Sequence, residues 1–404
     1  MPASRSRLGV IFLTVFIDLV GFGIILPILP YYAQRFGARG LGFGALVGVF
    51  SLMQFLATAL LGRLSDRVGR RPIILATTLI NAVGYLLFAS AGSYALLFLA
   101  RMISGFAGGN ISAAQAYVAD VTSPSERSKG MGLIGAAFGL GFIVGPAVGG
   151  LAGHYGGHAA PGLVAAGLSL VNFVSAYLIL PESLREEHRA TREAPFGHLA
   201  EALADRRTRP LMIVWGLAPF AFAGYTVALP LYAGVEFGWR ERELGWFFTL
   251  VGLTAAIVQG YLFGKLAKRV GDRALVIAGT FGMAVGIAVV PFLSSATSLY
   301  GWTVVLAFSN SLMAPAATGL VSTFAAPTEQ GAVLGAAQAL AALGRFSGPE
   351  VVGSVYDRIA PGAAFVTAGA VMLLAALAAL RLDHVSPSLA TGSAVGAGGH
   401  LPRS

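Results

Sequence analysis

Long apolar runs, separated by short polar segments, follow one another along the whole chain. A run of about 20 residues is the length that an α-helix needs to cross the hydrocarbon of a bilayer. The pattern therefore predicts membrane-spanning helices throughout. Twelve runs of this kind lie at residues 8–32, 43–62, 72–91, 95–119, 130–152, 162–180, 210–232, 243–263, 273–293, 298–320, 331–353 and 362–381.

Two motifs recur in the second half of the chain at almost the same separation. The polar segment 62–71, GRLSDRVGRR, is repeated as GKLAKRVGDR at 264–273, an offset of 202 residues. A Gly-x3-Gly-Pro-x3-Gly motif begins at Gly141 and again at Gly344, an offset of 203. Two motifs that share nearly one offset predict an all-α integral membrane protein of two pseudo-symmetric six-helix bundles, with a cavity between them near the middle of the membrane.

One long polar connection separates the sixth run from the seventh. It divides the chain into an N-terminal bundle (1–184), a cytoplasmic linker (185–209) and a C-terminal bundle (210–383). The remaining segment, 384–404, is rich in Ser, Gly and Ala, and we expect it to be disordered because it has little apolar surface to bury.

Composition excludes a water-soluble protein. Of the 404 residues, 56% are hydrophobic and only 11% are charged, whereas a soluble surface needs about a quarter of residues charged. The sequence contains no Cys, so thiolate metal sites and cysteine nucleophiles are excluded as well.

The net charge of +9 does not indicate nucleic-acid binding, because the basic residues lie in the loops. With both termini placed in the cytoplasm, 20 of the 27 Lys and Arg residues are inside and five are outside. The remaining two, Arg101 and Arg345, lie within spans. By the positive-inside rule, this distribution predicts cytoplasmic termini in a cell or inner membrane.

Several motifs together resemble the major facilitator superfamily, and within it the twelve-helix drug/proton antiporters of the tetracycline-efflux type. The motifs that carry the resemblance are the signature loop 62–71, Arg101 with Gly105 and Gly108 in span 4, the antiporter motif 141–150 in span 5, residues 21–30 in span 1, and Leu-Pro-Glu-Ser at 180–183. The resemblance implies a secondary active transporter that works by alternating access. It further implies proton-coupled antiport that exports small amphipathic or cationic organic compounds, as in multidrug efflux.

We expect no enzymatic activity and no cofactor. The expected partners are a small-molecule substrate, protons and the lipid bilayer, with no nucleic acid, and the expected state is a monomer.

Two groups of residues are predicted to gate the transporter. In the signature loop, a carboxylate among arginines can pair with them or with a helix N-terminus of the opposite half. In span 5, small residues around a proline permit close helix packing and bending. The predicted gating residues are Gly62, Asp66, Arg67, Gly69, Arg70, Arg71, Gly141, Gly145, Pro146 and Gly149. The alternatives are a loop that only sets topology and generic packing of small residues.

Ionisable residues within spans are costly in hydrocarbon and therefore indicate function. Asp18 lies about 15 Å along the first span, near the bilayer midplane. On an ideal helical wheel, Gln115 shares a face with Arg101 whereas Asn110 points away. We predict that Asp18, Arg101 and Glu350 take part in proton coupling, and that Asp18 and Arg101 meet across the cavity. The alternatives are a structural hydrogen bond for Asp18 and a carbonyl-binding role for Arg101.

Polar and aromatic residues in the spans expected to line the cavity are candidates for substrate binding. They are Phe22, Gln54, Gln115, Phe138, Tyr225, Gln259, Asn310, Gln338 and Arg345. Any one of these polar residues can equally form a hydrogen bond between helices.

Signatures of enzymes are absent from the sequence: it contains no Walker loop, no GxSxG and no HExxH. His154 and His158 share one outer loop, but no third metal ligand accompanies them.

Two alternatives to drug export remain open. One is proton-coupled transport of a sugar or an amino acid, and the other is a non-transporting membrane receptor or scaffold.

Overall fold

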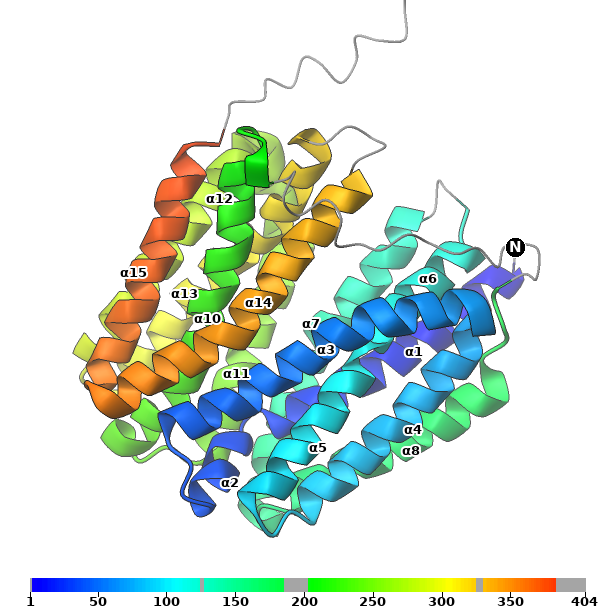
Figure 1. The fold of residues 1–404 in the computed structure, drawn as a ribbon, viewed down its shortest axis with the longest axis horizontal. Helices are drawn as coiled ribbons and strands as arrows, with labels where there is room; N and C mark the ends of the chain where they lie inside the picture. Colours follow the sequence, from blue (N-terminus) through cyan, green and yellow to red (C-terminus); the bar gives the residue numbers. More distant parts are fainter. Residues whose placement is uncertain (1, 124–126, 185–202, 325–329, 383–404) are drawn as a thin grey trace, which may run out of the picture.

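In the computed structural model, residues 2–123, 127–184, 203–324 and 330–382 are described. This part of the chain is helical, and its helices form two bundles (Figure 1). The bundles touch at one end and diverge toward the end that holds the N-terminus. We call the end with the N-terminus the terminal end, and the opposite end the far end.

The first bundle contains eight α-helices and one 3-10 turn. They are α1 (Pro2–Ile25), α2 (Leu29–Arg35), α3 (Gly40–Val68), α4 (Arg70–Ala89), α5 (Tyr94–Ala107), η1 (Gly108–Asn110), α6 (Ile111–Val121), α7 (Arg127–Gly156) and α8 (Ala160–Ile179). The second bundle contains α10 (Arg209–Phe237), α11 (Glu241–Ile257), the π-turn η3 (Val258–Leu262), α12 (Phe263–Val289), η4 (Val290–Phe292), α13 (Ala296–Phe324), α14 (Gln330–Arg358) and α15 (Pro361–Leu380).

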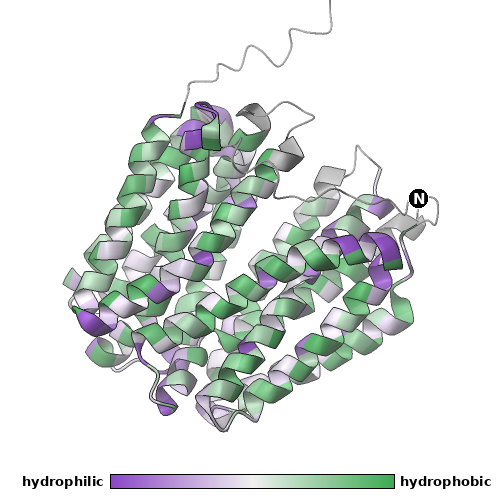
Figure 2. Cartoon of the chain, viewed as in Figure 1, coloured by the Kyte–Doolittle hydropathy of each residue, from purple (hydrophilic) through white to green (hydrophobic). Residues whose placement is uncertain are grey.

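Each predicted span corresponds to one helix or to consecutive helices, so the expected all-α membrane fold is confirmed. Among the described residues, ten helical stretches are long and apolar enough to cross a membrane. One of them, Glu241–Phe292, contains two consecutive predicted spans. Hydrophilic residues gather at the ends of the bundles, including the junction of α3 and α4 (Figure 2). The predicted tail and most of the predicted linker lie outside the described residues.

Interruptions in the first and fourth predicted spans affect the candidate sites. The first ends at Ile25, and α2 follows as a separate short helix with Pro30 at its start. Proline lacks a backbone N–H and sets the chain direction at a helix start, which suits this break. The fourth span is divided by the 3-10 turn Gly108–Asn110. A 3-10 turn advances about 120° per residue instead of about 100°, so it rotates the face presented by α6 relative to α5.

The repeated Gly-Pro motif packs one helix closely against another in both halves. An alanine at Gly149 of α7 would collide with the Ile24 carbonyl of α1. An alanine at Gly348 of α14 would collide in the same way with the Phe220 carbonyl of α10. The predicted close packing is therefore present in both copies, and α7 continues as one helix through Pro146.

The last glycine of each motif contacts the opposite half. Gly150 of α7 lies against Gly245 of α11, and Gly353 of α14 lies against the Gly40 carbonyl of α3. Two helix pairs, α7 with α11 and α3 with α14, thus cross between the bundles in equivalent ways. These pairs close the far end.

Polar contacts reinforce the closed far end. The Asp357 carboxylate on α14 accepts hydrogen bonds from the backbone N–H groups of Gly40 (2.9 Å) and Leu41 (2.8 Å). It therefore caps the N-terminus of α3 from the other half. The Tyr31 hydroxyl also donates to the Trp239 carbonyl across the same interface, at 2.8 Å.

Candidate substrate cavity and charged sites

A cavity of about 630 Å³ lies between the two bundles. Its wall is formed by residues of α1, α2, α3, α5 and α7 on one side and of α10, α11, α13 and α14 on the other. This position agrees with the cavity that the sequence repeat predicts, and the size is within the usual range for small-molecule sites.

Most of the predicted binding residues line this cavity. Those in its wall are Phe22, Gln54, Tyr225, Gln259, Asn310 and Arg345. Three others, Gln115, Phe138 and Gln338, have exposed side chains and are not part of the wall in this conformation. For Gln115 the reason is physical, because the 3-10 turn before α6 breaks the ideal helical wheel that placed it beside Arg101.

Aromatic rings form much of the cavity wall. The Phe22 ring lies 5.0 Å from Phe50 and 5.8 Å from Phe142, measured between ring centroids. On the other half, Phe222 stacks on Tyr225 at 6.1 Å. Sequence reasoning missed other wall residues, including Phe50, Ser51, Trp215, Thr226 and Phe248. Their positions depend on which helix faces the other bundle, which periodicity alone does not give.

Asp18 does not line the cavity. It is half-buried within the first bundle and accepts a hydrogen bond from the Asn110 amide at 2.7 Å and another from the Asn172 amide at 3.0 Å. The predicted contact between Asp18 and Arg101 is therefore wrong for this conformation. Asn110, which an ideal wheel turned away, is a direct partner because it belongs to the 3-10 turn. Asn172 was missed, although an Asn in an apolar run was the available signal.

Arg101 is held by its own bundle. Its side chain, 3% exposed, donates from Nε to the Leu46 carbonyl at 3.3 Å and lies over the Phe50 ring at 4.3 Å from the centroid. This is the carbonyl-binding alternative that the sequence left open. Arg101 also forms part of the cavity wall.

Glu350 lies at the crossing of α14 and α3, outside the cavity wall. A side chain added at Gly48 of α3 would come within 3.5 Å of its carboxylate. Its half-buried carboxylate thus belongs to the interface that closes the far end.

The signature loop forms a charged cluster at the terminal end. Asp66 and Asp120 both make ion pairs with Arg70, the second at 3.2 Å. Gly69, with φ of 117°, turns the chain from α3 into α4. The predicted pairing of Asp66 with an arginine is confirmed, and its described partner belongs to the same half.

A carboxylate from the end of the first bundle caps α4. Glu182 accepts hydrogen bonds from the backbone N–H groups of Arg70 (3.0 Å) and Arg71 (3.1 Å). An alanine at Gly69 would lie 2.5 Å from this carboxylate. The Leu-Pro-Glu-Ser segment therefore fixes the signature loop to the end of α8, a contact that the sequence did not predict.

The second copy of the loop keeps the turn but changes the charges. Gly271, with φ of 81°, repeats the bend of Gly69. The Arg273 side chain donates to the Leu382 carbonyl at 2.6 Å, just as Arg71 donates to the Tyr177 carbonyl at 2.7 Å. In both halves an arginine after the bend thus binds the end of the last helix.

Comparison with known proteins agrees with this geometry. The sequence profile of the Major Facilitator Superfamily matches residues 11–241 and 220–402. The tetracycline resistance protein, class C, of Escherichia coli is 32% identical over 400 residues, which cover 96% of this chain and all of that protein. Multidrug resistance protein 2 of Bacillus subtilis (strain 168) is 29% identical over 350 residues, covering 85% of this chain and 87% of that protein.

A solved structure is similar to this chain in fold and in sequence. The crystal structure of the human organic anion transporter MFSD10 (TETRAN) is 28% identical and has a TM-score of 0.71, covering 94% of this chain and all of that chain. The chain belongs to the major facilitator superfamily and is a multi-pass integral membrane transporter, not an enzyme.

Proposed function

We propose that this transporter exports small amphipathic organic compounds in exchange for protons. The observation that carries the proposal is the cavity between two equivalent bundles, closed at the far end by two equivalent helix crossings. Such a cavity can be exposed to one side of the membrane at a time if the crossings open when the terminal end closes. Relatives described as tetracycline and multidrug resistance proteins support export.

The positive-inside distribution of Lys and Arg supports a cytoplasmic location of the terminal end. With that orientation, this conformation takes up substrate from the cytoplasm. The direction of transport would then be outward, with protons entering in return.

The character of the cavity wall favours amphipathic substrates over sugars. A sugar site needs a polar partner for most hydroxyl groups, because an unpaired buried polar group costs about 1–3 kcal/mol. Phe22, Phe50, Phe142, Phe222 and Phe248 instead form a large aromatic surface. A site of this kind accommodates an apolar body with few directional requirements.

Asp18 is the proposed proton carrier. Its carboxylate is held by two neutral amides, those of Asn110 and Asn172, and by no cation among the described residues. A carboxyl group inside the membrane can take up and release a proton as helix movement changes its access to water. Asp18 lies on α1, which packs closely on α7, and α7 crosses to α11 of the other half. Movement of the two halves can therefore be transmitted to Asp18 through α7 and α1.

The test uses the Asp18→Asn variant in proteoliposomes with a pH-sensitive dye inside. Two matched probes, naphthalenesulfonate and naphthyltrimethylammonium, share an aromatic body and differ in the sign of their charge. Asn keeps the size of Asp but cannot titrate. We expect the variant to lose proton-driven accumulation of the transported probe while it still binds that probe.

Glu350→Gln is the comparison variant, since Glu350 lies at the interface that closes the far end and is the second candidate for proton coupling. Proton-driven accumulation by Asp18→Asn at the wild-type rate would show that Asp18 is not the carrier. If neither probe moves protons through the wild-type protein, the proposed antiport is wrong.

A further inference from the structure

We propose that the cavity selects organic anions, and that Arg345 binds their anionic head group. The inference rests on the proposed function only in that the cavity is taken as the transport site. It replaces the expectation of cationic substrates, which came from the family resemblance and not from the cavity itself.

The sign of charge in the cavity wall is the first observation. Among the described residues that form the wall, the side chains charged at neutral pH are Arg101 and Arg345. The same wall contains no Asp, Glu, Lys or His. A cationic substrate would meet two like charges there and no carboxylate, and like charges in a site of low polarity repel strongly.

The two arginines differ in what already binds them. Arg101 is almost fully buried and is occupied by the Leu46 carbonyl and the Phe50 ring. Arg345 is partly exposed to the cavity, and no hydrogen bond or ion pair joins it to another described residue. Arg345 therefore has its whole guanidinium free for a ligand, whereas the Nε of Arg101 is used by Leu46 and its guanidinium lies over the Phe50 ring.

Carboxylates elsewhere in the bundles do not neutralise Arg345. Glu350 is on the same helix but is turned about 140° away, at 100° per residue, and lies in the crossing with α3 beside Gly48. Asp18 is hydrogen-bonded to Asn110 and Asn172 and does not reach the cavity wall.

A guanidinium in such surroundings is a strong anion site. It offers planar, paired donors that match a carboxylate or a sulfonate, and it is less strongly hydrated than an ammonium group. Burial of the Arg345 guanidinium without a counter-ion is costly. An anionic ligand offsets that cost when it binds in the cavity.

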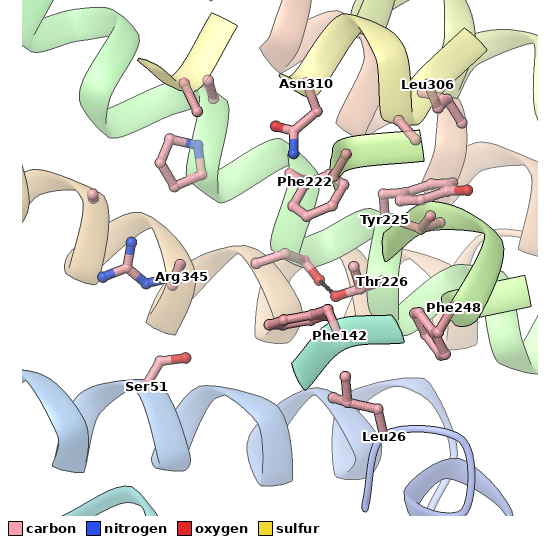
Figure 3. A pocket seen from close by; sticks show the side chains of 18 of the residues that line it. Leu26, Ser51, Phe142, Phe222, Tyr225, Thr226, Phe248, Leu306, Asn310 and Arg345 are labelled. Carbon is pink, nitrogen blue, oxygen red and sulfur yellow. Dashed lines mark hydrogen bonds between the residues drawn. The ribbon is translucent and has the colours of Figure 1, made fainter. Parts of the chain in front are cut away.

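The surroundings of Arg345 also suggest how the rest of the ligand is held. Figure 3 shows Arg345 and Ser51 at one end of the view, with Tyr225 and Phe248 at the other and Phe142 and Phe222 between them. The cavity thus has a cationic end and an aromatic end. This arrangement fits an amphipathic anion whose aromatic body extends away from its head group.

The test compares binding of naphthalenesulfonate and naphthyltrimethylammonium to the full chain in lipid nanodiscs. We expect the wild-type protein to prefer the sulfonate. Arg345→Gln should weaken sulfonate binding roughly 10- to 100-fold, the loss expected for a charge-assisted contact. It should leave binding of the ammonium probe unchanged or improved.

Three further variants make the result specific. Arg345→Lys keeps the charge and should retain most of the preference, whereas Arg345→Glu should reverse it. Arg358→Gln removes an exposed cation from the far end of the same helix and should bind both probes as the wild type does. Thermal unfolding of each variant identifies any loss caused by misfolding, and Arg345→Glu tests the inference by gain of cation binding.

A wild-type protein that binds the ammonium probe more tightly, or an Arg345→Gln variant with unchanged sulfonate binding, would overturn the inference. Proton-coupled transport of the ammonium probe would leave the proposed antiport intact while excluding anion selectivity. Sulfonate binding that depends on Arg345 without any proton movement would support anion selectivity and contradict the proposed antiport.

Discussion

Charged side chains in the membrane spans are stabilised in three different ways. Asp18 is held by neutral amides, and Arg101 by a backbone carbonyl and an aromatic ring. Arg345 has no protein partner among the described residues and lines the cavity. A charge inside the membrane is expensive without a partner or water. The residue without a protein partner is therefore the one best suited to bind something else.

The contacts of Arg101 predict a structural role. Arg101→Lys keeps the positive charge but loses the Nε donor to Leu46 and the planar stacking on Phe50. We expect this variant to lower the free energy of unfolding by about 1 to 2 kcal/mol. The pH dependence of transport should match that of the wild type, because Arg101 does not contact Asp18. Denaturation in detergent and transport over a pH series measure the two effects.

A shifted pH profile with unchanged stability would instead assign Arg101 to proton coupling. Arg358→Gln is a suitable control for loss of a cation, since Arg358 is exposed at the end of α14.

The charged residues within the spans were identifiable from the sequence, whereas their partners and much of the cavity wall were not. An ionisable residue in an apolar run is conspicuous, and this singled out Asp18, Arg101 and Arg345. Partners depend on helix rotation, and three residues of 3-10 turn were enough to bring Asn110 to Asp18. Asn172 comes from α8, and no local pattern relates that helix to α1.

At the scale of the helices, glycines decide which faces meet. Gly149 brings α7 against α1, whereas Gly135, about four turns earlier in the same helix, has no atom within 4 Å of the position that a side chain would take. The two glycines are in the same helix and so share its length and its backbone geometry. They differ in what surrounds them.

This contrast gives a matched pair of variants. Gly149→Ala should destabilise the protein by about 1–3 kcal/mol, because the added methyl group collides with the Ile24 carbonyl. Gly135→Ala should be neutral or stabilising by up to about 1 kcal/mol, since alanine favours the helix and meets no neighbour. Thermal unfolding in detergent compares them. Equal stability of the two variants would contradict the packing assigned to the motif.

The spans themselves were predictable because length and apolar composition suffice for a helix in a membrane. Their ends were less so. The first span was expected to extend to residue 32, but the chain breaks after Ile25 and restarts at Leu29. The cap of α4 by Glu182 joins residues more than a hundred positions apart, and only the folded bundle shows it.

At the scale of the whole molecule, the far end is closed by contacts that must break when the cavity opens there. The glycine crossings contribute close packing, and Asp357 adds a polar contact between the halves. A carboxylate at a helix N-terminus pairs with free N–H groups and with the positive end of the helix dipole. Asp357 therefore favours the conformation seen here over one that is open at the far end.

Loss of this contact should shift the balance between the two conformations. A capping side chain contributes about 0.5–2 kcal/mol, so Asp357→Ala should raise the population open at the far end roughly 2- to 30-fold.

The absence of native Cys allows spin labels at two introduced cysteines without further changes. Tyr155 on α7 and Phe292 after α12 are exposed positions on opposite halves at the far end. Double electron–electron resonance should then show a larger fraction of long distances in Asp357→Ala. Glu236→Ala, which removes an exposed carboxylate from the same end of α10, should leave the distances unchanged. If Asp357→Ala gives the wild-type distribution, the cap does not hold the far end closed, and the glycine crossings alone must do so.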